Sequence, residues 1–99
     1  MRKITQESVR NFIDGVPFKK SNMEVTREGN IYYLKLFGNK IAARLDDGRM
    51  WISNAGWQSN TTKERLNGLP GVNIIQRNWS WVLNGMPWDG KPIFIDIDA

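Results

Sequence analysis

Five tryptophans are the most prominent chemical feature of this 99-residue sequence. Trp79 and Trp81 are two residues apart, so in a β-strand both rings lie on one face, where they can form a stacking platform for nucleic-acid bases. Tryptophans also fill the cores of small domains and pair across strands, and burial is the commoner outcome for a single ring. For Trp57 a recognition role is about as well supported as burial, because its predicted loop is rich in Asn, Gly, Gln and Ser.

Basic side chains are the second lead to function. The net charge is +4 at pH 7, and the first 44 residues hold nine Lys or Arg against four acids. In an alternating strand Lys40 and Arg44 project from the same face, so a basic stripe along the sheet can follow a phosphate backbone. The candidate nucleic-acid-binding residues are Lys19, Lys20, Lys35, Lys40, Arg44 and Trp57. An equally good interpretation is a solvated sheet face with lysines at its edges that prevent aggregation.

The residue types that most enzymes need are missing. The sequence has no cysteine and no histidine, which excludes thiol nucleophiles, Cys/His zinc sites and imidazole bases. Asp46 and Asp47 precede a glycine and indicate a turn. Asp96 and Asp98 share a face of the last predicted strand, but no third acid is near them to complete a magnesium site. We therefore predict a protein that is not an enzyme, with no metal and no cofactor.

The densest polar stretch, residues 53–67, suggests contacts with a partner. Thr61 and Glu64 have the spacing of a capping box at the start of a second helix. A helix N-terminus can bind an anion, but the Glu64 carboxylate is expected to fill that place already. Tryptophan and arginine dominate the energetics of many protein interfaces. The candidate partner-binding residues are Trp51, Trp57, Lys63 and Arg65.

Hydrophobic periodicity predicts the elements that position these residues. A helix is expected over residues 6–14, with Thr5 as its N-cap and Gly15 as its left-handed stop. An antiparallel meander follows, with a hairpin turn at Gly38-Asn39, and its strands are predicted at 23–27, 31–37, 40–45 and 49–53.

The second half is predicted to contain a short helix and further strands. The helix starts at Thr61 and ends at Gly68. Strands are expected at 72–77 and 79–83, with the hairpin turn Asn84-Gly85 after them and a last strand that alternates through Ile93, Ile95 and Ile97. The predicted fold class is α+β, with an N-terminal helix, an antiparallel β-meander, a short second helix, and a C-terminal β-hairpin and strand. We expect residues 1–99 to form a single small domain.

No apolar run is long enough to span a bilayer, and polar residues follow the first three positions, so we expect neither a membrane segment nor a signal peptide. The pattern leaves monomer and homodimer both open.

Several segments resemble a known group of proteins. They are Trp51-Ile-Ser-Asn-Ala-Gly-Trp57, Thr61-Thr-Lys-Glu-Arg-Leu-Asn67, Leu69-Pro-Gly-Val72, Trp81-Val-Leu-Asn-Gly85 and Trp88-Asp-Gly90. This pattern is similar to small accessory proteins of tailed bacteriophages. The resemblance implies a protein made in the cytoplasm of an infected bacterium. The group has no assigned activity, so the resemblance assigns no functional residues.

Two functions follow as hypotheses. The first is a non-enzymatic nucleic-acid-binding module that uses a basic sheet face and tryptophans. Single strands are favoured, because no predicted helix is long or basic enough to read a duplex groove. The second is an inhibitor or adaptor that binds and blocks a bacterial host or anti-phage defence protein, which the resemblance favours more than the composition does.

Overall fold

The structure is a computed structural model that describes residues 1–96. Within this range the chain forms two helices and nine strands, which confirms the predicted α+β class. Their order is α1 (Lys3–Asp14), β1 (Phe18–Lys20), β2 (Met23–Glu28), β3 (Ile31–Leu36), β4 (Asn39–Arg44), β5 (Met50–Ile52), α2 (Asn60–Leu66), β6 (Ile74–Arg77), β7 (Ser80–Leu83), β8 (Met86–Trp88) and β9 (Ile93–Ile95).

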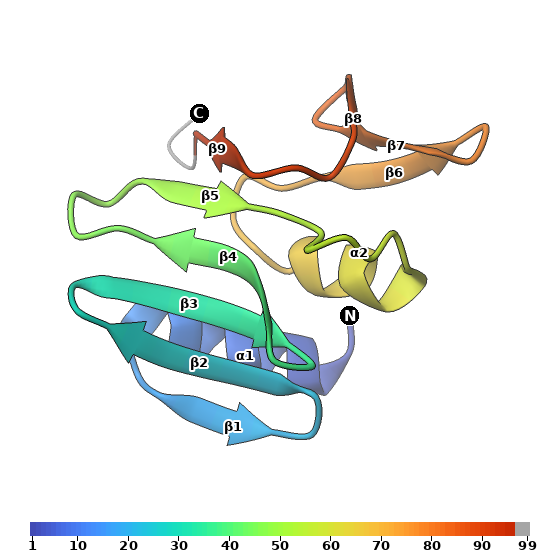
Figure 1. Ribbon diagram of the computed structural model, residues 1–99. Helices are drawn as coiled ribbons and strands as arrows, with labels where there is room; N and C mark the ends of the chain where they lie inside the picture. Colours follow the sequence, from blue (N-terminus) through green and yellow to red (C-terminus); the bar gives the residue numbers. More distant parts are fainter. Residues whose placement is uncertain (97–99) are drawn as a thin grey trace.

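The described strands form two antiparallel sheets. The larger has the order β1-β2-β3-β4-β5-β9 and the smaller β6-β7-β8. Helix α1 lies behind β2 and β3 in Figure 1, so the large sheet has an α1 face, turned away from the viewer, and an outer face, turned toward the viewer. Helix α2 lies beside the turn between β3 and β4, and the small sheet lies at the upper right of the same view.

One hydrophobic cluster joins these elements. Phe12 of α1 packs against the inward residues of the large sheet, and Leu66 of α2 and Trp81 of the small sheet belong to the same cluster. The sheet contributes alternate residues, as expected for strands with one dry face, among them Met23, Val25, Leu34, Leu36, Met50 and Ile52. The core therefore lies on the α1 face and leaves the outer face available.

The first helix begins earlier than predicted. It starts at Lys3, and Arg2 is the N-cap without a side-chain cap. Thr5 is fully buried inside the helix, and its hydroxyl donates to Glu64 Oε1 at 2.5 Å. The predicted N-cap at Thr5 is wrong because this hydroxyl serves a contact between the helices. The predicted stop at Gly15 is confirmed, with φ 71°.

The predicted capping box of α2 is also wrong. The helix begins at Asn60, and the N-cap is Ser59, whose Oγ accepts a hydrogen bond from the backbone N–H of Thr62 at 3.1 Å. The Glu64 carboxylate points toward α1, where it accepts a hydrogen bond from Thr5, and it does not cap α2. Gly68 follows the helix where the chain passes close to α1, since a Cβ there would lie 2.6 Å from Thr5 Cγ2.

Two hairpin turns differ from the prediction. The turn between β3 and β4 is Phe37-Gly38, with φ of 51° and 79°, one residue earlier than expected. The turn between β6 and β7 is Asn78-Trp79, with φ of 50° and 69°. Trp79 is therefore an exposed turn residue, while Trp81 is only 2% exposed and packs against Trp88. The two rings therefore form no stacking platform, and Trp81 takes the core position that is the commoner outcome for a single tryptophan.

The C-terminal half contains one confirmed turn and one unexpected pairing. Asn84-Gly85 connects β7 to β8 as predicted, and both residues have positive φ. Strand β9 pairs with β5, which makes it an edge of the large sheet. Ile97 of the predicted last strand and Asp98 of the acidic pair lie outside the described residues.

Candidate nucleic-acid interface

A row of aromatic side chains crosses the outer face of the large sheet. The strand register aligns Tyr33 with Ala43, Ala43 with Trp51, and Trp51 with Phe94. The buried Ala43 leaves room beside it, and the rings of Tyr33 and Trp51 meet edge to face with centroids 6.4 Å apart. Phe94, at the sheet edge, is 53% exposed. We call Tyr33, Trp51 and Phe94 the aromatic row.

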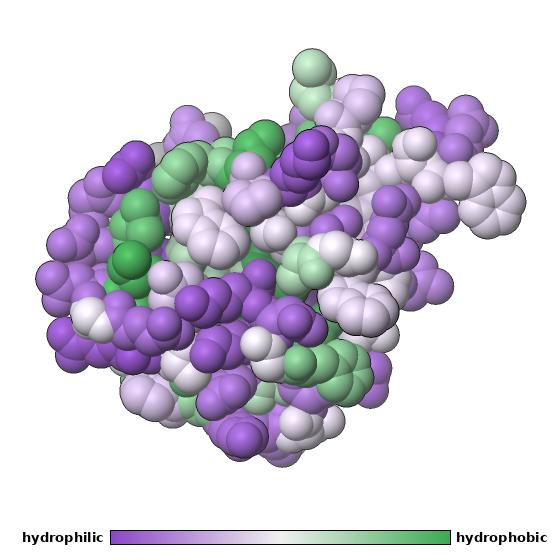
Figure 2. All heavy atoms as spheres, viewed as in Figure 1, coloured by the Kyte–Doolittle hydropathy of each residue, from purple (hydrophilic) through white to green (hydrophobic). Residues whose placement is uncertain are grey.

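Cations lie over both ends of the aromatic row. Lys40 Nζ is 4.0 Å from the ring centroid of Tyr33, and the guanidinium carbon of Arg49 is 4.9 Å from that of Phe94. Lys35 pairs with Lys40 across β3 and β4 and adds a third cation to this face. Rings of this kind stack on bases, and cations beside them can meet phosphates. In the view of Figure 2, pale and green residues lie among purple hydrophilic ones on this face.

A β-bulge decides which cations share the face. Strict alternation along β4 would place Lys40 and Arg44 on one side. The register instead shifts between Leu34 and Lys35, which leaves Ile41 as the extra residue and turns Lys40 to the side of Lys35. Arg44 stays on the α1 face, where its guanidinium carbon is 5.2 Å from the ring centroid of Tyr32. The predicted basic stripe through Lys40 and Arg44 is therefore wrong.

The two lysines of β1 also face opposite sides. Lys19 aligns with Glu24 and lies on the outer face, toward the sheet edge. Lys20 aligns with Met23 on the α1 face, and its Nζ is 3.3 Å from Glu7 Oε1. Of the predicted basic residues, the structure thus brings Lys35 and Lys40 together and places Lys19 further out on the same face.

Carboxylates accompany the cations of the outer face. Glu28 lies 3.7 Å from Lys35 Nζ and 3.3 Å from Lys40 Nζ. Asp47 lies 2.7 Å from Arg49, and hydrogen bonds from the backbone N–H and the side chain of Arg49 hold the pKa of Asp47 below its ordinary value. These pairs are solvent-exposed in whole or in part, so each contributes little to folding stability.

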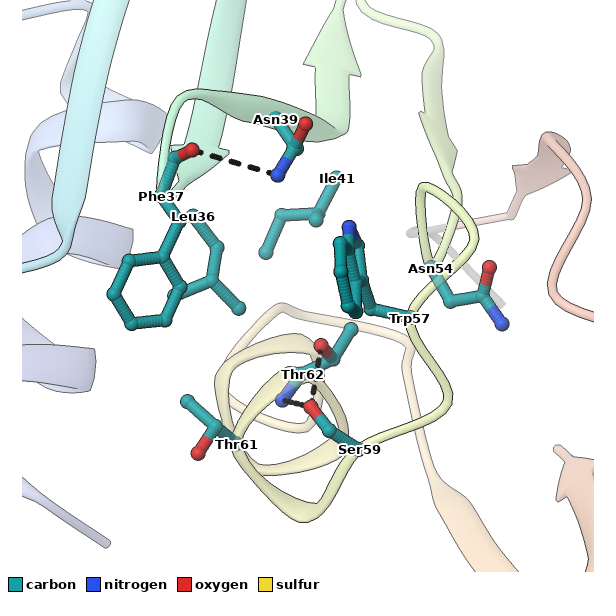
Figure 3. Close-up of a pocket in the computed structure, with 9 residues that line it drawn as sticks. All are labelled: Leu36, Phe37, Asn39, Ile41, Asn54, Trp57, Ser59, Thr61 and Thr62. Atoms are coloured by element: carbon teal, nitrogen blue, oxygen red, sulfur yellow. Dashed lines mark hydrogen bonds between the residues drawn. The ribbon is translucent and has the colours of Figure 1, made fainter.

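Trp57 lies apart from the aromatic row. It is 63% exposed and lines a pocket of about 560 Å³ between the β3–β4 turn and the start of α2 (Figure 3). Trp51, by contrast, belongs to the row. The two tryptophans among the predicted partner-binding residues, Trp51 and Trp57, therefore lie at two different places.

Comparison with known proteins assigns the chain to a family. A family model described as Kyanoviridae Gp96 protein matches residues 1–97. The chain belongs to this family. The Kyanoviridae are phages, so membership confirms the expected phage origin, and the Gp96 family carries no assigned function. No curated protein and no solved structure matches the chain. Within residues 1–96 of this Gp96-family chain, the helices are too short and too polar to cross a membrane.

Arg65 of the Gp96-family chain is a buried structural residue. It is 1% exposed, and its guanidinium donates to Thr5 Oγ1 at 3.1 Å, to Asn22 Oδ1 at 3.3 Å and to the carboxylate of Glu64. The prediction that Arg65 contacts a partner is wrong, because the side chain is buried and its two terminal nitrogens bind residues of this chain. Lys63 is half-buried on α2.

The Glu64 carboxylate gives this network a pH dependence. Burial acts to raise the pKa of Glu64, but hydrogen bonds from the Thr5 hydroxyl, the Arg65 guanidinium and the backbone N–H of Arg2 outweigh it and lower the pKa below the ordinary value of 4.5. A carboxyl with a lowered pKa in the folded state stabilises the fold above its unfolded-state pKa, and this contribution is lost as the pH falls through the folded-state pKa.

We therefore expect Glu64→Gln to lower the free energy of unfolding by about 1 kcal/mol at neutral pH. The difference from wild type should shrink as the pH falls below 4.5. Urea unfolding followed by circular dichroism at several pH values measures it. A difference that is the same at neutral pH and at about pH 3 would show that ionised Glu64 does not stabilise the Gp96 fold.

Three residues of this interface, Tyr33, Arg49 and Phe94, are not among the residues predicted from the sequence. Tyr33 and Phe94 lie in alternating segments, but only the pairing of β5 with β9 brings Phe94 beside Trp51. Arg49 follows a turn and gave no sign that it would cover an aromatic ring. In the Gp96-family chain, one sequence feature could have indicated Phe94. It lies between Ile93 and Ile95, so in a strand its side chain projects from the opposite face to theirs.

Proposed function

We propose that the outer face of the large sheet binds single-stranded nucleic acid without catalysis. Bases stack on the aromatic row, and Lys35, Lys40 and Arg49 meet the phosphates. The observation that carries the proposal is the alignment of three rings across one sheet face with a cation over each end. Known RNA-binding sheets present two or three stacking aromatics in this way.

The shape of the surface favours a single strand over a duplex. A broad sheet face does not fit the major groove, which admits a helix or a two-stranded ribbon. A single strand, in contrast, exposes its bases to an aromatic surface. The net charge of +4 favours any polyanion, and a phage protein acting in the host cytoplasm meets single strands of both DNA and RNA.

A charge-removal experiment tests the proposal. We expect Lys35→Ala/Lys40→Ala to weaken binding to a labelled single-stranded oligonucleotide. The slope of log K against log salt should fall by roughly 1.4, because each phosphate neutralised on a single strand contributes about 0.7. The matched control is Lys20→Ala, which removes an exposed lysine from the α1 face and should change neither quantity. Equal losses in the double variant and in Lys20→Ala would assign the binding to overall charge and overturn the proposed face.

Glu28 provides a test with the opposite sign. Its carboxylate now neutralises Lys35 and Lys40, so Glu28→Gln should raise the affinity for a single strand by about threefold at low salt. Fluorescence anisotropy measures the change, which should fade at high salt. Glu7→Gln, which frees Lys20 on the α1 face, is the control and should leave affinity unchanged. A similar gain in both variants would mean that net charge alone decides the affinity.

A second candidate function is an adaptor or inhibitor that binds a host or defence protein. The observation that favours it is on the small sheet, where Trp79 is 86% exposed at a turn and Ile75 and Met86 are also exposed. Exposed tryptophans often anchor protein interfaces. Affinity purification from infected cells tests it: a stoichiometric host protein retained by the wild type and lost with Trp79→Ala would favour this function over the first.

A further inference from the structure

The pocket beside Trp57 has the form of a site for a flat ring. Its floor is made by the buried side chains of Leu36 and Ile41. Figure 3 shows the Phe37 ring and the Trp57 indole on opposite sides of this floor, with Thr62 of α2 below. The volume of about 560 Å³ lies within the range of small-molecule sites.

Phe37, at the edge of this pocket, has a backbone conformation that phenylalanine rarely adopts. It is 72% exposed and occupies the left-handed region with φ 51°, where a bulky side chain is disfavoured and Asn or Gly is usual. Folding gains little from a phenylalanine in this position, because its ring lies largely in solvent. Strained residues of this kind concentrate at functional sites. The aromatic ring at residue 37 is therefore better explained by a ligand than by the turn.

Hydrogen bonds within its own loop fix the backbone of Trp57. Its backbone N–H donates to the carbonyl of Asn54 at 2.9 Å, and the neighbouring Gly56 N–H donates to Asn54 Oδ1 at 2.8 Å. The next residue, Gln58, donates from its side chain to the carbonyl of Trp79 at 3.0 Å. The exposed indole thus stands on an ordered loop, which lowers the entropy lost when a ring stacks on it.

The lining identifies the chemistry of the ligand. None of the residues that line this pocket, all of them within residues 1–96, carries a charge, so the pocket suits a neutral group and not a phosphate. Two aromatic walls favour a planar ring, and the Asn39 amide and the Thr61 hydroxyl can meet the polar edge of a heterocycle.

The pocket lies at the β3–β4 turn, near one end of the proposed interface but apart from the aromatic row. Lys40 directly follows Asn39, which lines the pocket, and lies over Tyr33 of the aromatic row. Phe37 is four residues beyond Tyr33, roughly 13 Å along the strand direction. We infer that this pocket binds one nucleobase of the strand that crosses the outer face. The inference rests on the proposed function and adds a base-binding site to it.

Fluorine NMR of protein labelled with 5-fluorotryptophan tests both claims separately. Single Trp→Phe variants assign the five resonances. Addition of a short oligothymidine should shift Trp51 and Trp57 at the same concentrations and leave the buried Trp81 in place. A shift of Trp51 without Trp57 would overturn the pocket and keep the face. A shift of Trp57 alone would keep the pocket and overturn the face. Unchanged resonances would overturn both.

Two variants measure the contribution of the pocket to affinity. Trp57→Ala should weaken oligothymidine binding about tenfold, the effect of losing one stacked base. The control, Trp79→Ala, removes a still more exposed tryptophan and should have no effect. Phe37→Asn should weaken binding while it keeps or raises the unfolding temperature, because asparagine tolerates the left-handed backbone. Full affinity in Trp57→Ala and Phe37→Asn would overturn the inference.

Discussion

Replacement of Arg65 with alanine is expected to lower the free energy of unfolding by about 3 kcal/mol, and with it the unfolding temperature by roughly 15 °C. The side chain is buried and joins three parts of the fold, since it donates to Thr5 of α1, to Asn22 between β1 and β2, and to Glu64 of α2. Alanine leaves a cavity and removes the donor from a partly buried carboxylate. Thermal unfolding followed by circular dichroism measures the loss.

Two further variants show what Arg65 contributes. Arg10→Ala removes an exposed arginine of α1 and should change the free energy of unfolding by no more than about 0.5 kcal/mol. Arg65→Met restores most of the buried volume without the hydrogen bonds, so it should lose less stability than Arg65→Ala. If Arg65→Ala is as stable as Arg10→Ala, the buried network does not hold the helices and the turn together.

The second large effect concerns binding. We expect Trp51→Leu/Phe94→Leu to weaken the affinity for a single-stranded oligonucleotide by roughly 100-fold, because each stacked base contributes about 1–3 kcal/mol. Leucine keeps an apolar side chain on the sheet but removes the flat ring. The variant should therefore remain folded, which circular dichroism verifies before the anisotropy titration.

Trp79→Leu is the matched control for that loss. It removes an aromatic ring that is more exposed than Phe94 but lies on the turn of the small sheet. Its affinity should equal that of the wild type. If Trp79→Leu weakens the affinity as much as Trp51→Leu/Phe94→Leu does, or if the double variant keeps full affinity, bases do not stack on the aromatic row.

Local sequence patterns predicted the parts of the fold that local chemistry determines. Gly15 ends the first helix and Asn84-Gly85 forms a turn, because these residues accept the left-handed backbone that each position needs. Thr5 and Glu64 were misassigned as caps for a reason that no local window contains. The Thr5 hydroxyl donates to the Glu64 carboxylate across the two helices, although the two residues are 59 positions apart in sequence.

The candidate interface was less predictable than the fold, because it depends on register and long-range pairing. The bulge at Ile41 moves Lys40 away from Arg44, and a strict two-residue period cannot anticipate such a shift. Phe94 joins Trp51 only because β9 pairs with β5, across more than 40 residues. Trp57 was identified correctly as a loop residue, since its neighbours alone indicate a loop. The exposure of its ring, 63%, could be known only from the structure.

The most direct test of the proposed function is fluorescence anisotropy of a labelled single strand and of the duplex of the same sequence, each titrated with wild-type protein at low and at physiological salt. The proposed interface predicts saturable binding to the single strand that weakens steeply with salt and exceeds binding to the duplex at both concentrations. Binding that is equal for the two forms, or absent at low salt, would contradict it.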